Sequence, residues 1–307
     1  MKITVLGAGA MGALFGGYLA GQNEVYLVDV DARRVERINA EGVRIREQDG
    51  TEKVYHPVAV TETAGLPEMD LVIVFVKAMY TESALEANCG LIGPETYLMT
   101  LQNGAGHESK LLKFADRAHV VIGTTQHNGS LLGDGHVNHG GGGKTVIGLL
   151  DGGSERLRGI AETFTASGFA CTTSDEVKAQ IWRKLFLNTA ASTLTGILQV
   201  PLGYILENRY ACELMEAMAR EAVTVANAEG AAVFDAESVI AEIKEVLSRS
   251  RAGYTSIYAD VKNGARTEVD TISGSVVEAA HALGVPVPFH EMAVKLIHAL
   301  EGRGSWK

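Results

Sequence analysis

The chain has 307 residues, a net charge of −10 at neutral pH, and 46% hydrophobic and 21% charged residues. This length suits two domains, and the composition can supply each of them with a hydrophobic core. The negative charge and the lack of a basic cluster exclude nucleic acid as a partner, and no run reaches the roughly 18 apolar residues of a membrane helix.

The first half alternates short β-rich runs with helical stretches. A strand over Lys2–Leu6 leaves no room for a signal peptide. A helix is expected over Ala10–Ala20, and the Gly-rich segment Asn128–Lys144 is typical of a turn or hairpin. Further strands are expected over Val25–Val28, Leu71–Val76, Tyr97–Thr100, Val120–Thr124 and Thr145–Gly148. Alternating β and α elements with continuous apolar strands predict an α/β, Rossmann-type, doubly wound parallel sheet.

The second half is helical. Thr173 and Glu176 have the spacing of a capping box and predict a helix over Asp175–Leu198. Further helices are expected over Asn208–Glu229, Ala236–Val246, Ser256–Lys262, Glu268–Leu283 and Phe289–Glu301. We therefore expect a Rossmann domain over residues 1–170 and an all-α substrate and catalytic domain over residues 171–307.

A glycine motif stands directly after the first strand and opens the first helix: Gly7, Ala8, Gly9, Ala10, Met11 and Gly12. Its three glycines permit a tight turn, close approach of a pyrophosphate, and close packing of the helix. Asp29 ends the second strand, 17 residues beyond Gly12, near the expected spacing of about 20. Together they predict a nicotinamide dinucleotide site.

The choice of cofactor is open at this point. Asp29 would accept hydrogen bonds from a ribose 2′-OH and repel a 2′-phosphate, which favours NAD(H). Arg33 and Arg34 follow closely and could reach a 2′-phosphate, or they could be solvated charges at the start of a helix. Asp29 could also cap the helical segment that begins at Asp31.

Two polar residues follow later strands at the edge where open α/β sheets bind ligands. Lys77 comes after the apolar run Leu71–Val76, and Asn103 comes after Tyr97–Thr100. Each has a purely structural alternative, because an exposed Lys after a strand is common and Asn-Gly is a turn signal. Their position favours contact with the cofactor for Lys77, and with both cofactor and substrate for Asn103.

The helix around Lys184 is apolar on almost every side, so we expect it to be buried. Lys184, Asn188 and Ser192 interrupt it at i, i+4 and i+8, which predicts one polar stripe. A Lys in such a place suits ketone reduction, because it can stabilise the negative charge on the ketone oxygen and donate a proton. The alternative is a Lys whose amine reaches the surface beside Arg183.

A third group of polar residues stands near the C-terminus. Ser256 and Asp260 share one face of an expected helix, and Glu268 follows a break at Asn263–Gly264. We expect the first two to bind substrate and Glu268 to orient the Lys or the substrate. The alternative for Glu268 is an acid in a first helical turn that complements the helix dipole.

In this order the motifs resemble those of the ketopantoate reductase (2-dehydropantoate 2-reductase) family, over nearly the whole chain. The resemblance rests on GAGAMG (residues 7–12), Val76-Lys77-Ala78, Gln102-Asn103-Gly104, Trp182-Arg183-Lys184-Leu185 with Asn188, Ser256 to Asp260, and Thr267-Glu268-Val269-Asp270. It implies NADPH-dependent reduction of 2-dehydropantoate to pantoate, for pantothenate and coenzyme A synthesis. It also implies that Lys184 is the general acid, that Asn188 and Ser256 bind the ketoacid, and that Glu268 touches cofactor and substrate.

Three positions depart from the family, which often has Asn where Ser192, Leu202 and Gly253 stand in this chain. Another 2-keto acid, a β-hydroxyacid dehydrogenase activity and a non-catalytic dinucleotide sensor therefore remain alternatives. Of these, a sensor would need neither Lys184 nor Glu268.

Other ligands and assembly are less specified by the sequence. His127, His136 and His139 lack a further metal ligand, so we expect no metal site. Three widely spaced cysteines, at 89, 171 and 212, suit a reducing cytoplasm. The expected partner is a small 2-keto acid, and a homodimer through the helical half is left open.

Overall fold

The computed structural model describes residues 1–303 and divides into two compact units. The sheet unit comprises Met1–Gln102 and His107–Val177. The helical unit comprises Asn103–Gly106 and the chain from Lys178 onward. The division expected after residue 170 thus lies after Val177, because residues 170–173 form a strand that completes the sheet.

Eight of the described strands form one sheet in the order β12-β11-β8-β7-β6-β1-β2-β5. They are β1 (Lys2–Leu6), β2 (Glu24–Val28), β5 (Val58–Val60), β6 (Leu71–Val74), β7 (Tyr97–Thr100), β8 (Val120–Thr125), β11 (Lys144–Leu149) and β12 (Ala170–Thr173). Neighbouring strands are parallel except β11 and β8. The chain leaves β1 toward β2 and later returns to β6 on the other side of β1, so β1 and β6 flank the point where the strand order reverses. Ligands bind at such a point in open α/β sheets.

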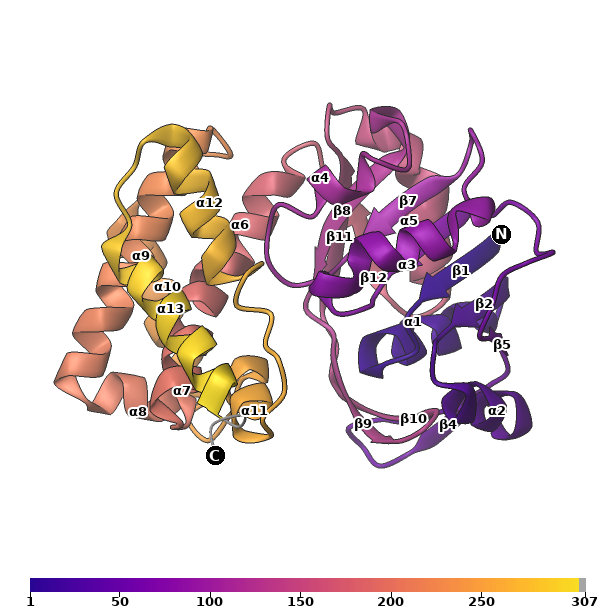
Figure 1. The fold of residues 1–307 in the computed structure, drawn as a ribbon, viewed down its shortest axis with the longest axis horizontal. Helices are drawn as coiled ribbons and strands as arrows, with labels where there is room; N and C mark the ends of the chain where they lie inside the picture. Colours follow the sequence, from indigo (N-terminus) through magenta and orange to yellow (C-terminus); the bar gives the residue numbers. More distant parts are fainter. Residues whose placement is uncertain (304–307) are drawn as a thin grey trace. The chain divides into compact units, whose positions relative to one another are not determined.

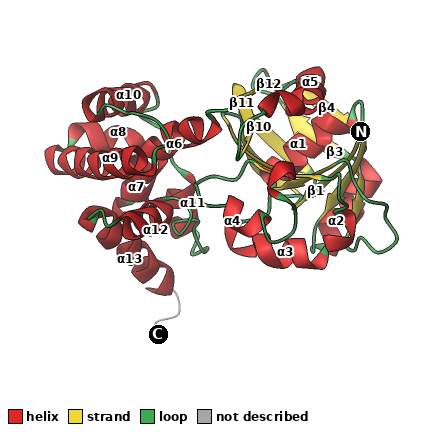
Figure 2. Ribbon diagram, turned by 90° about the horizontal axis from the view of Figure 1, so that it is seen from above, coloured by secondary structure: helices red, strands yellow, loops and turns green. Residues whose placement is uncertain are grey.

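Helices cover both faces of this sheet (Figures 1 and 2). They are α1 (Ala10–Ala20), α2 (Ala32–Glu41), α3 (Thr81–Ala87), α4 (Glu108–Leu111) and α5 (Arg158–Ala166). Helix α1 packs on α5, where the ring centroids of Phe15 and Phe164 are 6.0 Å apart. Helix α1 is also held close to β2, since a Cβ at Gly16 would stand 2.4 Å from Cδ2 of Leu27.

A second, four-stranded sheet in the order β4-β3-β10-β9 packs against α1. Its strands are β3 (Val43–Arg46), β4 (Glu52–Tyr55), β9 (Asn128–Gly133) and β10 (His136–Gly141). The hairpin β9–β10 is the Gly-rich segment of the sequence, and it pairs in parallel with β3.

The helical unit is built around α9, which contacts α8, α10, α12 and α13 (Figure 1). Its elements are α6 (Val177–Leu187), the π-helical turn η5 (Asn188–Ser192), α7 (Thr193–Leu198), α8 (Leu202–Glu207), α9 (Arg209–Glu229), α10 (Ala236–Arg249), α11 (Ser256–Lys262), α12 (Ser273–Leu283) and α13 (Pro288–Gly302). No helix among residues 1–303 is long and apolar enough to cross a membrane.

Two helix starts differ from the sequence predictions. Helix α6 begins at Val177, and the expected capping box is absent because Thr173 pairs with Ile147 inside the sheet. Helix α12 begins at Ser273 rather than Glu268. The backbone N–H groups of Thr271 and Ile272 both bond to the carbonyl of Glu268 and close a turn there. β-Branched residues make this stretch a poor helix former.

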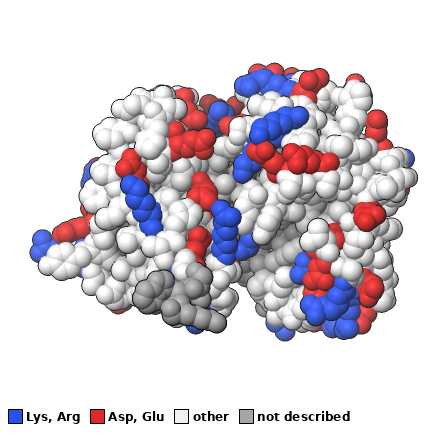
Figure 3. Space-filling model, in the orientation of Figure 1, with Lys and Arg blue, Asp and Glu red and all other residues white. Residues whose placement is uncertain are grey.

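Charge is mixed on the face shown in Figure 3, where Lys and Arg lie beside Asp and Glu. The protein has ion pairs between exposed side chains, such as Arg209 with Glu213 at 2.8 Å and Lys113 with Glu82 at 2.7 Å. Exposed pairs of this kind contribute little to stability, typically about 0 to 1 kcal/mol each.

Candidate active site

The glycine loop between β1 and α1 has the backbone that a pyrophosphate site requires. Gly7 has φ +96°, and a Cβ there would lie 2.8 Å from the backbone nitrogen of Val76. A Cβ at Gly12 would lie 1.8 Å from the carbonyl oxygen of Gly7. Around Gly9, by contrast, no described protein atom lies within 4 Å of such a Cβ. The loop is therefore tightly packed on the protein side and open at Gly9, where the N-terminus of α1 offers N–H groups to an anion.

Lys77 lies beside this loop, at the carboxyl end of β6. It is exposed and precedes a short 3₁₀ turn, η1 (Ala78–Tyr80). The preceding residue is anchored by Gln102, whose Nε2 donates to the carbonyl oxygen of Val76 at 2.6 Å. The structure thus brings Lys77 and the glycine loop together at the reversal point of the sheet. The sequence signal for Gln102 was only its place in the Gln-Asn-Gly loop.

Asp29 is built into the same loop. Its side chain is only 8% exposed. One carboxylate oxygen accepts the backbone N–H of Ala8 at 2.8 Å, and the other accepts the N–H of Asp31 at 3.0 Å. Asp31, not Asp29, caps α2, because its side chain accepts from Arg33 and Arg34. Asp29 therefore ties the end of β2 to the glycine loop.

The two arginines differ in their surroundings. Arg34 is largely buried and donates to Asp29 at 2.9 Å, while Asp134 and Asp31 lie 3.6 and 3.8 Å away. Arg33 is 80% exposed and pairs with Asp134 at 3.0 Å. Sequence reasoning missed Asp134, which comes from the turn between β9 and β10 and lies 100 residues beyond Arg34. Five charged side chains thus lie together beyond the end of β2, which is where the sequence predicts contact with the cofactor ribose.

In the helical unit, Lys184 lies in the last turn of α6 and is half-buried. Burial lowers the pKa of its amine from 10.5 to about 8, and the nearby Glu268 carboxylate opposes that shift. Desolvation disfavours the charged form of a lysine, which explains the direction. The structure therefore places the two predicted catalytic residues in electrostatic contact. It also makes the Lys184 amine a readier proton donor near neutral pH.

The loop that carries Asn103 packs against the turn that carries Glu268. The backbone N–H of Ala105 donates to the carbonyl of Thr271 at 3.0 Å. A Cβ at Gly104, where φ is +102°, would stand 1.9 Å from that same oxygen. Only glycine fits this approach, which holds half-buried Asn103 near the Glu268 turn. Although Asn103 follows a strand of the sheet unit, its segment is grouped with the helical unit.

The predicted polar stripe of α6 runs into an irregular segment at its C-terminal end. Residues Asn188–Ser192 form a π-helical turn, in which the backbone bonds i to i+5. Asn188 is half-buried, whereas Ser192 is 7% exposed.

Helix α11 is bonded to this π turn. The hydroxyl of Thr255 caps α11 by accepting the N–H of Tyr258, and it lies 2.9 Å from the hydroxyl of Thr195 and 3.5 Å from the carbonyl of Ser192. Ser256, exposed at the first turn of α11, and half-buried Asp260 share the face one turn apart. Sequence reasoning missed Thr255, although a Thr just before a helix is a capping signal.

Leu202 and Gly253, two of the positions at which the sequence predicts a departure from the family, contact each other. The N–H of Leu202 donates to the carbonyl of Gly253 at 3.0 Å, and a Cβ at Gly253 would lie 3.3 Å from Cδ1 of Leu202. An aliphatic side chain and a glycine are therefore in contact here.

The three histidines of the Gly-rich segment make their hydrogen bonds within the sheet unit. Nδ1 of His127 lies 3.0 Å from Nε2 of His139, whose Nδ1 lies 2.8 Å from Glu47. His136 pairs instead with Glu52. Within residues 1–303, no group of three or more His, Cys, Asp or Glu side chains is arranged to hold a metal ion.

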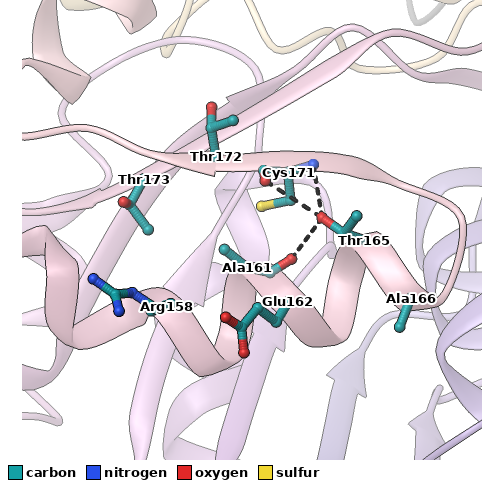
Figure 4. A pocket seen from close by; sticks show the side chains of 8 residues that line it. All are labelled: Arg158, Ala161, Glu162, Thr165, Ala166, Cys171, Thr172 and Thr173. Atoms are coloured by element: carbon teal, nitrogen blue, oxygen red, sulfur yellow. Dashed lines mark hydrogen bonds between the residues drawn. The ribbon is translucent and has the colours of Figure 1, made fainter.

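A shallow pocket lies between α5 and the edge strand β12 (Figure 4). Its lining residues are Arg158, Ala161, Glu162, Thr165, Ala166, Cys171, Thr172 and Thr173. The Thr165 hydroxyl is satisfied locally, because it donates to the carbonyl of Ala161 at 2.8 Å. Burial raises the pKa of the Cys171 thiol to about 12, which makes it a poor nucleophile. None of the candidate residues lines this pocket.

Comparison with known proteins shows the family of the chain. A family model described as ketopantoate reductase PanE/ApbA matches residues 3–152, and the model of its C-terminal part matches residues 176–301. The chain is 34% identical over 291 residues to a 2-dehydropantoate 2-reductase of Halobacterium salinarum, covering 94% of this chain and 95% of that one.

Solved structures show the same fold. One is D-mandelate dehydrogenase with NADH and anilino(oxo)acetate, at 31% identity and a TM-score of 0.92, covering 100% of both chains. Another is a PanE/ApbA family ketopantoate reductase from Ralstonia eutropha JMP134, at 29% identity and a TM-score of 0.89, also covering 100% of both chains.

Proposed function

The chain belongs to the ketopantoate reductase family, and we propose that it reduces the ketone of 2-dehydropantoate to the alcohol of pantoate. The observation that carries this proposal is Lys184, an amine with its pKa lowered to about 8 beside the Glu268 carboxylate. Curated relatives of similar length bear the name 2-dehydropantoate 2-reductase.

The residues of the sheet unit fit a dinucleotide. Gly7 and Gly12 admit no side chain, while the open space at Gly9 suits a pyrophosphate at the N-terminus of α1. Asp29 and Lys77 would contact the two ribose moieties, from the ends of β2 and β6 respectively. When bound, a reduced nicotinamide supplies the hydride for the reaction.

Lys184 would supply the proton. Negative charge builds on the ketone oxygen as its carbon gains hydride, and the Lys184 ammonium hydrogen-bonds that oxygen. The ammonium then donates its proton to the oxygen, which gives the 2-hydroxy acid and a neutral amine. An amine with a pKa of about 8 is about nine-tenths protonated at pH 7, so the donor is present before the reaction.

Glu268 would favour this protonation state. Its carboxylate raises the pKa of Lys184 against the larger effect of burial, and so keeps the amine charged at neutral pH. Its turn also carries the Thr271 carbonyl that binds the Asn103 loop. One short turn therefore supports both the general acid and a residue expected at the reacting centre.

Polar residues around the π turn would hold the ketoacid. Asn188 and Ser192 come from η5, and Ser256 stands at the N-terminus of α11, which the Thr255 hydroxyl joins to η5. Hydroxyl and amide groups can bind a carboxylate and the substrate hydroxyl without adding a competing charge. Asp260 lies one turn beyond Ser256 and would accept from a substrate hydroxyl.

For the cofactor, we propose that NADH is accepted appreciably, beside or in place of NADPH. The buried Asp29 carboxylate and the pairing of Arg34 with three acids support this, because of the two arginines Arg33 is then the one exposed to a 2′-phosphate, and it already pairs with Asp134. An NADPH preference beyond about 100-fold in kcat/KM, or about 2.7 kcal/mol, would contradict the proposal. If the proposal holds, Arg33→Ala lowers kcat/KM for NADPH and leaves kcat/KM for NADH unchanged. Arg37→Ala, on the same helix, is the control and changes neither value.

A second candidate substrate is an aryl 2-keto acid. It is favoured by the apolar contact of Leu202 with Gly253 and by the structural likeness to D-mandelate dehydrogenase. An apolar contact at these positions would suit a ring better than the hydroxyl of ketopantoate.

The deciding experiment follows oxidation of NADH and NADPH with 2-dehydropantoate, 2-oxoisovalerate and phenylglyoxylate. The proposal expects the highest kcat/KM with 2-dehydropantoate. Preference for phenylglyoxylate would select the second candidate, and absence of turnover with all three would indicate a dinucleotide-binding protein without reductase activity.

A further inference from the structure

A buried chain of hydrogen bonds crosses the helical unit behind the π turn. The imidazole of His290 on α13 is fully buried, with Nδ1 2.7 Å from Oε2 of Glu221 and Nε2 2.8 Å from the hydroxyl of Thr189. The Thr189 hydroxyl lies 2.8 Å from that of Ser273, which lies 2.7 Å from that of Thr193. The five side chains come from α9, α13, η5, α12 and α7, and the four α-helices are labelled in Figure 1.

Glu221 anchors one end of this hydrogen-bond chain. Its Oε1 accepts the N–H of Phe289 at 2.9 Å, and its Oε2 accepts the N–H of His290 at 3.0 Å. A carboxylate only accepts, so Nδ1 of His290 carries a proton toward it. Nε2 of His290 makes the second hydrogen bond of the ring, with the Thr189 hydroxyl, which is bonded in turn to Ser273.

This chain of hydrogen bonds joins two parts of the candidate site, the π turn η5 and the turn that carries Glu268. Thr189 follows Asn188 directly within η5, and its carbonyl also faces the Ser273 hydroxyl at 3.4 Å. Ser273 is the first residue of α12, immediately after the turn that carries Glu268. His290 is therefore linked by hydrogen bonds, through Thr189 and Ser273, to both the π turn and the start of α12.

Packing alone does not explain this arrangement. The surrounding core consists of apolar side chains such as Phe186, Met218 and Val276, and a buried polar group among them is costly unless fully paired. Buried polar networks of this kind specify one local geometry where apolar packing tolerates several. A π turn is a local irregularity that is often found at functional sites. A buried hydrogen-bond network can select this geometry over a regular α-helix.

We propose that His290 is a positioning residue, which orients Asn188 and the Glu268 turn through the Thr189 hydroxyl. The inference rests on the proposed reductase function, since it concerns the geometry of that site. His290 itself need not touch substrate or cofactor. Displacement of reacting groups by about 1 Å can lower a rate about 100-fold, so a small shift of η5 is measurable.

The test compares variants that differ only in one hydroxyl or one imidazole. Thr189→Val keeps the side-chain shape and removes the hydroxyl, whereas Thr189→Ser keeps the hydroxyl. We expect Thr189→Val and His290→Leu to lower kcat/KM for the ketoacid about ten- to a hundredfold, while the Kd for the reduced dinucleotide stays unchanged. Thr189→Ser should stay within about threefold of wild type. His281→Leu, which removes a solvent-exposed His–Glu pair between α12 and α13, should leave the kinetics unchanged.

The double variant adds a second criterion. If His290 acts through Thr189, combining Thr189→Val with His290→Leu should lower kcat/KM no further than the worse single variant. Independent effects that multiply would overturn the proposal. So would a Thr189→Val protein with wild-type kcat and KM and only a lower melting temperature. Should His290→Leu fail to fold, the Thr189→Val and Thr189→Ser pair decides alone. Lack of turnover in the wild-type protein would instead refute the reductase function itself.

Discussion

Replacing Lys184 with Met should increase stability while abolishing most activity. The folded pKa of about 8, against 10.5 for an ordinary lysine, means that the charged amine is disfavoured in the fold. At about 1.4 kcal/mol for each tenfold change in proton affinity, the protonated amine costs about 3 kcal/mol at pH 7. Met has a similar length and no charge, so Lys184→Met should gain up to that amount.

The gain should depend on pH with a definite sign. Between pH 8 and 10.5 the unfolded chain holds the lysine proton and the folded chain does not, so wild-type stability rises with pH in that window. The advantage of Lys184→Met is therefore largest below pH 8 and vanishes near pH 10.5. Melting temperatures of both proteins at pH 7, 9 and 10.5 measure this directly.

Activity should change in the opposite direction. Removal of a general acid typically lowers kcat by about 10²- to 10⁴-fold, and the affinity for dinucleotide should stay the same. In the wild type, kcat for ketone reduction should fall as pH rises through about 8, because the donor proton is lost. A folded Lys184→Met protein that keeps more than about a third of wild-type kcat would refute the role of Lys184 as proton donor. A kcat that stays constant from pH 7 to 10 would refute it independently.

Three further predictions concern other residues. Gly9→Ala should fold normally, because no atom of another part of the described protein lies within 4 Å of the new Cβ. It should nevertheless weaken dinucleotide binding at least about tenfold, as measured by calorimetry. Gly90→Ala, whose new Cβ is equally unobstructed, is the control and should leave binding unchanged. Asn188→Ala should raise KM for the ketoacid with little change in kcat in steady-state assays, and an unchanged KM would remove Asn188 from substrate binding. Burial and the neighbouring His139 lower the pKa of His127 below 6.5, so the unfolded chain takes up this proton first and stability falls as pH drops below about 6.5. Melting temperatures between pH 7 and 5 should fall less in His127→Asn than in wild type, and equal slopes would contradict this assignment.

Local patterns in the sequence were sufficient for the glycine loop and for several strands of the sheet unit. A strand, a glycine motif and a helix are consecutive, and the roles of Gly7, Gly9 and Gly12 depend on backbone contacts within and beside that loop. Strands β1, β6 and β8 were identified from their apolar runs, because such a run is itself a local pattern. Strands β3 and β4 were missed, since each is only four residues long, whereas the hairpin β9–β10 lies in the Gly-rich segment for which a turn or hairpin was expected. Their pairing joins segments about 90 residues apart, as in Arg44 with His136.

The sequence by itself determined the Rossmann and helical halves, the cofactor loop and the presence of a lysine in an apolar helix. Only the tertiary structure decided how the polar groups around Lys184 are arranged. The π turn at Asn188–Ser192 is held by partners 84 and 101 residues away, Ser273 and His290. The pKa of Lys184 likewise depends on burial and on Glu268. These are contacts between distant segments, and local periodicity carries no information about them because it reports only the neighbours along one helix or strand.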